Sequence, residues 1–158
     1  MVKRTAGKAF LWLVVSCCLF SFSGLGGGYV FDDALAIEGN GDTDPASSFL
    51  ALWSHDIWGK HMLHIHSHHS YRPLLILVFK LLRTLYDSPV CLRLFSILSH
   101  TVATLLFYLM AEEVTGLSDL ALDAALLFAT HPVHVESVTA VVNTVSYTHL
   151  TLPTTPYV

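Results

Sequence analysis

The sequence predicts an all-α integral membrane protein, and three features of its composition and patterning point to this fold class. Hydrophobic residues make up 53% and charged residues 13% of the 158 residues, with a mean hydropathy of +0.58. An ordinary soluble domain has about 25% charged residues. The apolar residues fall in long blocks, and acidic residues gather between two of these blocks. We therefore expect about three transmembrane helices and a polar loop with helices at the membrane interface.

Residues 1–28 are expected to form a cytosolic tail and the first transmembrane helix. Lys3, Arg4 and Lys8 precede roughly 20 apolar or small residues, a length that can cross a bilayer. The small residues of FSFSGLGGG leave a cleaved signal peptide open as an alternative to a signal anchor. By the positive-inside rule the basic N-terminus stays cytosolic, which places the chain after about Tyr29 in the lumen or outside the cell.

Residues 29–70 are expected to form a luminal loop, acidic in its first part and rich in histidine at its end. Lys60 is the only base that opposes its acidic residues, which are Asp32, Asp33, Glu38, Asp42, Asp44 and Asp56. Asn40, Gly41 and Pro45 predict turns. The segment SSFLALWSHDIWG, residues 47–59, predicts a short amphipathic helix whose tryptophans suit a membrane interface.

Residues 71–87 are expected to form a helix that lies along the membrane surface. Their apolar run, RPLLILVFKLLRTLY, is too short to span a bilayer comfortably. On a helical wheel one side of the helix collects Arg72, Lys80, Arg83 and Asp87. An interfacial helix accounts for both the short length and the one-sided charge.

Two further transmembrane helices are expected at residues 93–111 and 117–142, the second of which leads into a second luminal loop. Leu94 to Ala111 is apolar and is closed by Glu112 and Glu113. Asp119 and Asp123 lie four residues apart, so their helical face should point to other helices or to water rather than to lipid. Pro132 should end or kink the last helix.

Several classes of site are excluded by charge and by cysteine usage. The net charge is −4 and the eight Lys and Arg residues are scattered, which gives no footprint for nucleic-acid binding. Cys17 and Cys18 lie in an apolar stretch and Cys91 stands alone, so their spacing indicates neither a disulfide framework nor a Cys-ligated zinc site. We interpret all three as buried small hydrophobic residues.

Four short segments together resemble one family. They are FDDALAI at Phe31–Ile37, LWSHDIWG at Leu52–Gly59, SHHSYRPL at Ser67–Leu74 and LFATHPVHVESV at Leu127–Val138. In this order and at these separations they resemble the N-terminal part of the transmembrane and tetratricopeptide-repeat-containing O-mannosyltransferases. The resemblance covers most of residues 9–142, and SYRPL followed by HPVHVESV is its most specific part.

The resemblance implies a GT-C-type glycosyltransferase that crosses the endoplasmic reticulum membrane several times. Members of this family are taken to move mannose from dolichyl phosphate mannose to Ser or Thr of secretory proteins. No cofactor is implied. The implied partners are membrane lipid, the lipid-linked sugar donor and the secretory acceptor proteins.

The resemblance also implies that Asp32 and Asp33 are the catalytic acidic pair, because similar enzymes hold that pair in the first luminal loop. A Ser or Thr hydroxyl needs a positioned base at neutral pH, whereas a phosphate leaving group needs little acid help. Asp32 is the expected base, and Asp33 would orient it or the acceptor. The residues alone leave an alternative, in which the two aspartates cap an interfacial helix.

Further residues of the matched segments are candidates for substrate binding. Arg72 is suited to bidentate capture of a lipid phosphate, although a snorkelling anchor is an equal alternative. Glu136 follows the third span, where GT-C enzymes place a second luminal acidic residue. His68 belongs to the matched SHHSYRPL. His131 and His134 flank Pro132 and could hydrogen-bond the same site, with buried structural histidines as the alternative.

The histidine tract supports a competing function, that of a metal-ion-binding or metal-transporting membrane protein. Imidazoles that alternate along an extended segment can converge on zinc or copper, and the tract contains His61, His64, His66, His68 and His69. A transporter, however, should place ionisable ligands inside its spans. We therefore assign no metal ligand and favour the enzyme.

The last residues depart from the family pattern. After HPVHVESVTAVV a segment like VVGRADLL is expected, followed by further spans and helical repeats. The chain instead has VVNTVSYTHLTLPTTPYV. We interpret residues 143–158 as an atypical tail arising from truncation or artefact, and we expect the fragment alone to be inactive because a catalytic pocket needs walls and a supporting shell.

Overall fold

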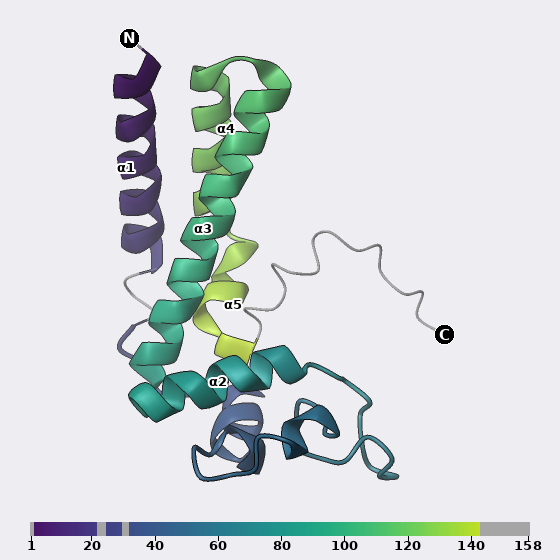
Figure 1. Cartoon of the computed structure of the whole chain (residues 1–158). Coiled ribbons are helices and arrows are strands. Elements are labelled where there is room, and N and C mark those ends of the chain that lie inside the picture. Colours follow the sequence, from purple (N-terminus) through teal and green to yellow (C-terminus); the bar gives the residue numbers. More distant parts are fainter. Residues whose placement is uncertain (1, 22–24, 30–31, 143–158) are drawn as a thin grey trace.

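The computed structural model describes residues 2–21, 25–29 and 32–142, and this part of the chain is built from helices and one irregular loop (Figure 1). The helices are α1 (Val2–Ser21), α2 (Pro73–Leu85), α3 (Pro89–Thr115), α4 (Ser118–Thr130) and α5 (His134–Thr139). The loop between α1 and α2 contains three short turns, η2 (Ala34–Glu38), η3 (Gly41–Thr43) and η4 (Ala51–Trp53). The described residues form no β-sheet, so the predicted all-α class is confirmed.

Helices α1, α3 and α4 lie side by side, and α2 crosses the bundle at one end with the loop beyond it (Figure 1). The N-terminus and the turn between α3 and α4 lie at the opposite end. Among the described residues one helix, α3, is long and apolar enough to cross a membrane, and the apolar part of α1, Lys8–Leu19, is shorter. The 13 residues of α4 extend roughly 20 Å, less than a hydrocarbon core of about 30 Å.

Helix α3 is longer at both ends than the predicted span at 93–111, and its end signals explain the difference. The Ser88 hydroxyl accepts a hydrogen bond from the Val90 N–H, and Pro89 takes the first helical position. At the other end Gly116 adopts the left-handed conformation, with φ 68°, and its N–H donates to the Glu112 carbonyl. The helix therefore continues through the two glutamates that were expected to close it.

Small residues bring α1 and α4 close to α3. The buried stripe of α1 contains Ala9, Leu13 and Cys17, whose thiol lies 3.7 Å from the Thr104 hydroxyl. The buried stripe of α4 consists of Ala121, Ala125 and Ala129. Small side chains at helix interfaces allow backbones to approach closely in membranes. Cys17 is thus buried as expected, whereas Cys18 is exposed and Cys91 is intermediate.

The two aspartates of α4 lie away from its alanine stripe. Asp119 and Asp123 are both exposed, and Asp123 borders a shallow hollow with Leu126, Leu127 and Thr130. Their face is therefore directed away from α1 and α3. Helix α4 ends at Thr130, two residues before Pro132, and α5 begins at His134, so the predicted break at this proline is confirmed.

The predicted amphipathic helix at residues 47–59 is wrong. The structure has only the short turn η4 there, and the chain then folds back, with the Asp56 N–H donating to the Lys60 carbonyl and the Ile57 N–H to the Ser70 carbonyl. The Asp56 carboxylate accepts the N–H groups of Trp58 and Lys60. An aspartate that binds nearby backbone N–H groups competes with helix formation, and here it wins.

The predicted helix at 71–87 is present as α2, but its basic residues face the loop. Lys80 is buried, and its ammonium donates to the carbonyls of Asp44 and Ser47 at 2.8 and 2.7 Å. The opposite side exposes Leu74, Leu81 and Leu85. This leucine side suits lipid, whereas the basic side holds the loop in place.

The end-to-end arrangement of the bundle allows a test of membrane orientation. The N-terminus should stay in the cytosol and the loop should face the lumen, because the basic cluster precedes α1. Pro45, Ala46 and Ser48 are exposed on the loop. An N-glycosylation acceptor sequence engineered into the turn from Asp42 to Ser48 should be modified in microsomes, and the same sequence in the N-terminal tail should not. The reverse labelling pattern would show that the orientation is inverted.

Candidate active site in the first loop

One hydrophobic core joins residues that lie in or just after the four segments that carry the resemblance. The first two segments supply core residues themselves, and the other two are each followed by core residues within a few positions of the chain. The core consists of Ala36, Ile37, Leu52, Ile57, Ile76, Phe79, Leu92, Val141 and Val142, with Tyr29, Trp58, Leu75 and Leu82 packed against it. Full burial of a large apolar side chain contributes about 1.5–3 kcal/mol, so this core stabilises the packing of the loop against α2.

Asp33 is a buried link between the first of these segments and the residues that follow the last one. Its side chain is fully buried, and its carboxylate oxygens accept the N–H groups of Val141 at 3.1 Å and Val142 at 2.9 Å. Although Asp33 precedes η2, its side chain makes no capping hydrogen bond. For Asp33 the helix-cap alternative is therefore wrong, and the carboxylate instead joins chain segments more than 100 residues apart.

Asp32 differs from its neighbour in burial and in hydrogen bonding. Its side chain is exposed, and the described residues provide no partner for its carboxylate. The buried anchor at Asp33 fixes the backbone next to it. The pair therefore consists of one carboxylate engaged in structure and one exposed carboxylate without a partner among the described residues, an arrangement that suits a general base.

Asp56, which the sequence analysis did not single out, joins the second and third segments. It is buried, and its carboxylate accepts hydrogen bonds from the Trp58 and Lys60 N–H groups, the Ser67 hydroxyl and the His68 N–H. Burial raises the pKa of this carboxyl, but the hydrogen bonds outweigh it and leave the pKa below its ordinary value. Asp56 is thus ionised and structural.

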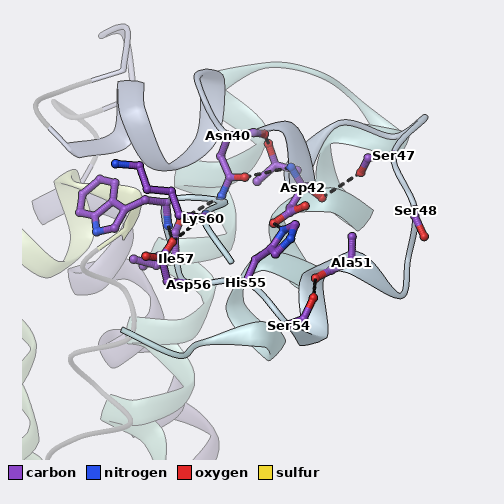
Figure 2. A network of polar contacts seen from close by, with 12 residues as sticks. Asn40, Asp42, Ser47, Ser48, Ala51, Ser54, His55, Asp56, Ile57 and Lys60 are labelled. Atoms are coloured by element: carbon purple, nitrogen blue, oxygen red, sulfur yellow. Dashed lines mark hydrogen bonds and ion pairs between the residues drawn. The ribbon is translucent and has the colours of Figure 1, made fainter. Parts of the chain in front are cut away.

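A second polar network closes the acidic part of the loop (Figure 2). The Asn40 amide donates to the Ile57 carbonyl at 2.9 Å and accepts the Asp42 N–H, while Asp42 pairs with His55 at 2.7 Å. Gly59 adopts φ 75°, and a Cβ there would lie 2.4 Å from the Asn40 side-chain oxygen. Only glycine is compatible with this backbone conformation and this close approach.

Arg83 ties α2 to the start of the loop. Its guanidinium donates to the Ile37 carbonyl at 2.9 Å and to the Thr43 hydroxyl at 2.7 Å. The same group donates to Asp87 at 2.9 Å, and this hydrogen bond lowers the pKa of Asp87. With Lys80, Arg83 satisfies loop carbonyls that no regular element pairs.

Arg72 and His68 lie on the SHHSYRPL segment, which the structure holds firmly. Arg72 is half-buried at the N-terminal end of α2, where its carbonyl accepts the N–H of Ile76. His68 is exposed and its ring meets Trp58 edge-on, with centroids 6.3 Å apart. Between them His69 has φ 54°, an uncommon conformation for a residue with a side chain. Both candidate side chains thus reach solvent from a constrained backbone.

The candidate residues around Pro132 separate into different environments. His134 is buried, and its ring packs on Phe128 and His100 with centroids 4.5 and 5.3 Å apart. His131 is exposed, and its Nδ1 accepts the Val133 N–H. The side chain of Glu136 lies outside the described residues.

The histidine tract does not form a compact cluster. His61, His64 and His66 are exposed, and the Nδ1 atoms of His61 and His64 accept backbone N–H groups two residues on. Across the described ranges, no three side chains of His, Cys, Asp or Glu are grouped so that they could hold a metal ion. The tract lies on the loop, beside the matched segments.

Arg93 is a second residue that the sequence analysis did not single out as functional. It lies in the first turns of α3 and is 2% exposed. Its guanidinium donates to the carbonyls of Gly27 and Gly28, in the stretch that connects α1 to Asp32. Nothing in the local sequence signals this contact, because the two partners are 66 and 65 residues apart.

Comparison with known proteins gives matches over most of the chain. It is 36% identical over 140 residues to a protein O-mannosyl-transferase of Caenorhabditis elegans, a match that covers 85% of this chain and 20% of that protein. It is 37% identical over 130 residues to human protein O-mannosyl-transferase TMTC3, covering 82% of this chain and 14% of the relative. Human protein O-mannosyl-transferase TMTC1 is 39% identical over 140 residues, covering 87% and 16%.

No family model and no solved structure matches the chain. The chain spans a fifth or less of the length of the three relatives described above. Their names agree with the resemblance carried by FDDALAI, LWSHDIWG, SHHSYRPL and LFATHPVHVESV. Over most of its own length the chain is thus a homologue of proteins named protein O-mannosyl-transferases, and it corresponds to only a small part of each of them.

Proposed function

We propose that the whole protein is a mannosyltransferase that moves mannose from dolichyl phosphate mannose to Ser or Thr of secretory proteins. The observation that carries the proposal is the exposed Asp32 beside the buried Asp33, whose carboxylate is anchored to Val141 and Val142. The relatives' names support mannosyl transfer to protein. The residues described here form part of the site, and the rest of the family's length would supply the other walls.

Asp32 is the general base of the proposed reaction. It takes the proton from the acceptor hydroxyl as the oxygen attacks the sugar carbon on the face opposite the phosphate. The bond to the phosphate oxygen breaks, and the lipid phosphate leaves as a stable anion without needing a proton. One carboxylate therefore suffices, which agrees with the engagement of Asp33 in structure.

A lipid-linked donor is consistent with a site at the end of the bundle where α2 and the loop lie. Half-buried Arg72 begins α2, whose exposed leucine side suits the membrane surface, so its guanidinium could bind a phosphate at that depth. We place the protein in the endoplasmic reticulum membrane as a multi-pass, GT-C-type enzyme, with α1, α3 and α4 as its first three spans. The short α4 would then cross together with the segment that follows it.

The proposal is tested by transfer of labelled mannose from dolichyl phosphate mannose to a folded acceptor domain, using the whole protein in membranes. Mannose should appear on Ser or Thr of the acceptor only when both the enzyme and the donor are present. A whole protein that is expressed and inserted normally, yet transfers mannose from no polyprenyl phosphate donor to any secretory acceptor, would contradict the proposal.

The histidine tract should not be required for this activity. Replacing His61, His64 and His66 by Ser in the whole protein should leave mannosyl transfer largely intact, because their exposed rings make only local contacts. The measurement is the initial rate with and without added zinc. Two results together would contradict this expectation: loss of activity in the triple variant, and loss of wild-type activity on chelation that added zinc restores. They would favour the metal-binding function.

A further inference from the structure

Arg93 carries a buried charge whose described partners are backbone carbonyls. The guanidinium donates to Gly27 and Gly28, and the Leu25 carbonyl lies 3.5 Å away. The two ion pairs found in the described part of the chain, His55–Asp42 and Arg83–Asp87, do not include it. Burying a cation is costly unless hydrogen bonds compensate it. For Arg93 these hydrogen bonds come from the carbonyls of Leu25–Gly28, the stretch that follows α1. The guanidinium and this backbone therefore hold each other in place.

Among Gly26, Gly27 and Gly28, only Gly27 lies so close to Arg93 that an added Cβ would contact the guanidinium. A Cβ added to Gly27 would lie 3.2 Å from both terminal guanidinium nitrogens, closer than ordinary van der Waals contact. A Cβ added to Gly26 would meet no atom within 4 Å. Gly27 therefore allows the guanidinium to approach the backbone, and Gly26 offers a matched position without that contact.

The glycine stretch leads directly to the proposed base. Gly28 precedes Asp32 by four residues, and on the other side of Asp32 the buried Asp33 is bound to Val141 and Val142. In the sequence the base thus lies between two contacts, one made by Arg93 of α3 and one made by the segment after α5.

We propose that Arg93 is a positioning residue that fixes the Leu25–Gly28 backbone so that Asp32 meets the acceptor hydroxyl in a productive geometry. This inference rests on the proposed function of Asp32 as the base. Arg93 acts through the backbone and does not touch the substrate. Its loss should therefore lower the turnover number rather than the affinity for the lipid donor.

The test compares Arg93→Lys and Gly27→Ala with Gly26→Ala in the whole protein. Lysine keeps the charge but cannot bind several carbonyls in one plane, as arginine does. For Arg93→Lys we expect kcat to fall by about 10- to 100-fold, the scale of a catalytic group displaced by about 1 Å, with little change in the donor KM. Gly27→Ala should show a smaller fall in kcat, and Gly26→Ala should resemble the wild type. A raised donor KM with unchanged kcat would instead place Arg93 on the donor phosphate and overturn the proposal.

A second measurement does not depend on activity. Leu25 is half-buried next to the contact, so a cysteine there, with Cys18 and Cys91 replaced by Ala, can be labelled with a water-soluble maleimide. Labelling should be several-fold faster with Arg93→Lys or Gly27→Ala than with Arg93 intact or with Gly26→Ala. Equal rates in all four proteins would overturn the proposed contact. If the wild type transferred no mannose but the labelling rates differed as expected, the proposed function would fail while the role of Arg93 in holding this backbone would stand.

Discussion

Asp32→Asn should reduce mannosyl transfer by about 100-fold or more, the scale at which the loss of a general base is felt. Asparagine keeps the shape of the side chain but cannot take the proton of the acceptor hydroxyl. Because Asp32 is exposed, the substitution should not disturb the fold. The assay measures the initial rate of transfer from dolichyl phosphate mannose to a folded acceptor domain, with expression and membrane insertion checked in parallel.

Asp33→Asn is the informative partner of this variant. The carboxylate of Asp33 accepts two backbone N–H groups, and an asparagine can accept only one while directing its own NH2 at the other. We expect a smaller but clear loss of activity, together with weaker attachment of the segment after α5. Full activity in both variants at normal expression would remove the central residues of the enzymatic proposal. An essential Asp33 with a dispensable Asp32 would reverse the two roles.

Features of the fold that depend on local composition could be predicted from the sequence. Pro132 ends α4 because a proline disrupts the helix that precedes it, and α2 is amphipathic because its charges recur at helical spacing. The loop could not be predicted in the same way. Its segment 47–59 has an amphipathic pattern, yet the hydrogen bonds of Asp56, a local one from the Trp58 N–H and a more distant one from the Ser67 hydroxyl, override the pattern.

The sequence motifs identified the candidate site residues, but only the structure shows how these residues are arranged. The sequence suggested Asp32 as the base and Asp33 as an orienting residue, but it gave no burial for either, and the structure shows that Asp32 is exposed and Asp33 fully buried. The difference arises from Val141 and Val142, whose contact with Asp33 spans more than 100 residues. Arg93 was likewise assigned no role, because a guanidinium that binds glycine carbonyls has no local sequence signature.

The loop should depend strongly on Asp56, although this residue is not expected to touch the substrate. Asp56→Ala leaves the Trp58, Lys60 and His68 N–H groups and the Ser67 hydroxyl without their shared acceptor. Hydrogen bonds to charged groups contribute about 1.5–3 kcal/mol each, and some donors will rebind water. We therefore expect the loop to lose about 3 kcal/mol or more of stability. Glu38→Gln, at an exposed position of the same loop, is the matched control and should behave as the wild type.

Limited proteolysis of the whole protein in detergent should show this loss as rapid cleavage between residues 47 and 70 in Asp56→Ala but not in Glu38→Gln.

The pH dependence gives an independent check. Because the pKa of Asp56 is lowered in the folded loop, its contribution is complete above the unfolded value of about 3.9 and fades as the pH falls through the lower folded value. The Asp56 contribution is therefore still complete between pH 7 and pH 5, and the cleavage rate of the wild type should not rise over this range. The protease must be one that stays active throughout the range. If the wild type and Asp56→Ala were cleaved at equal rates at pH 7, the prediction would fail. Core burial, and not the Asp56 carboxylate, would then hold Leu52–Gly59 and Ser67–Leu74 together.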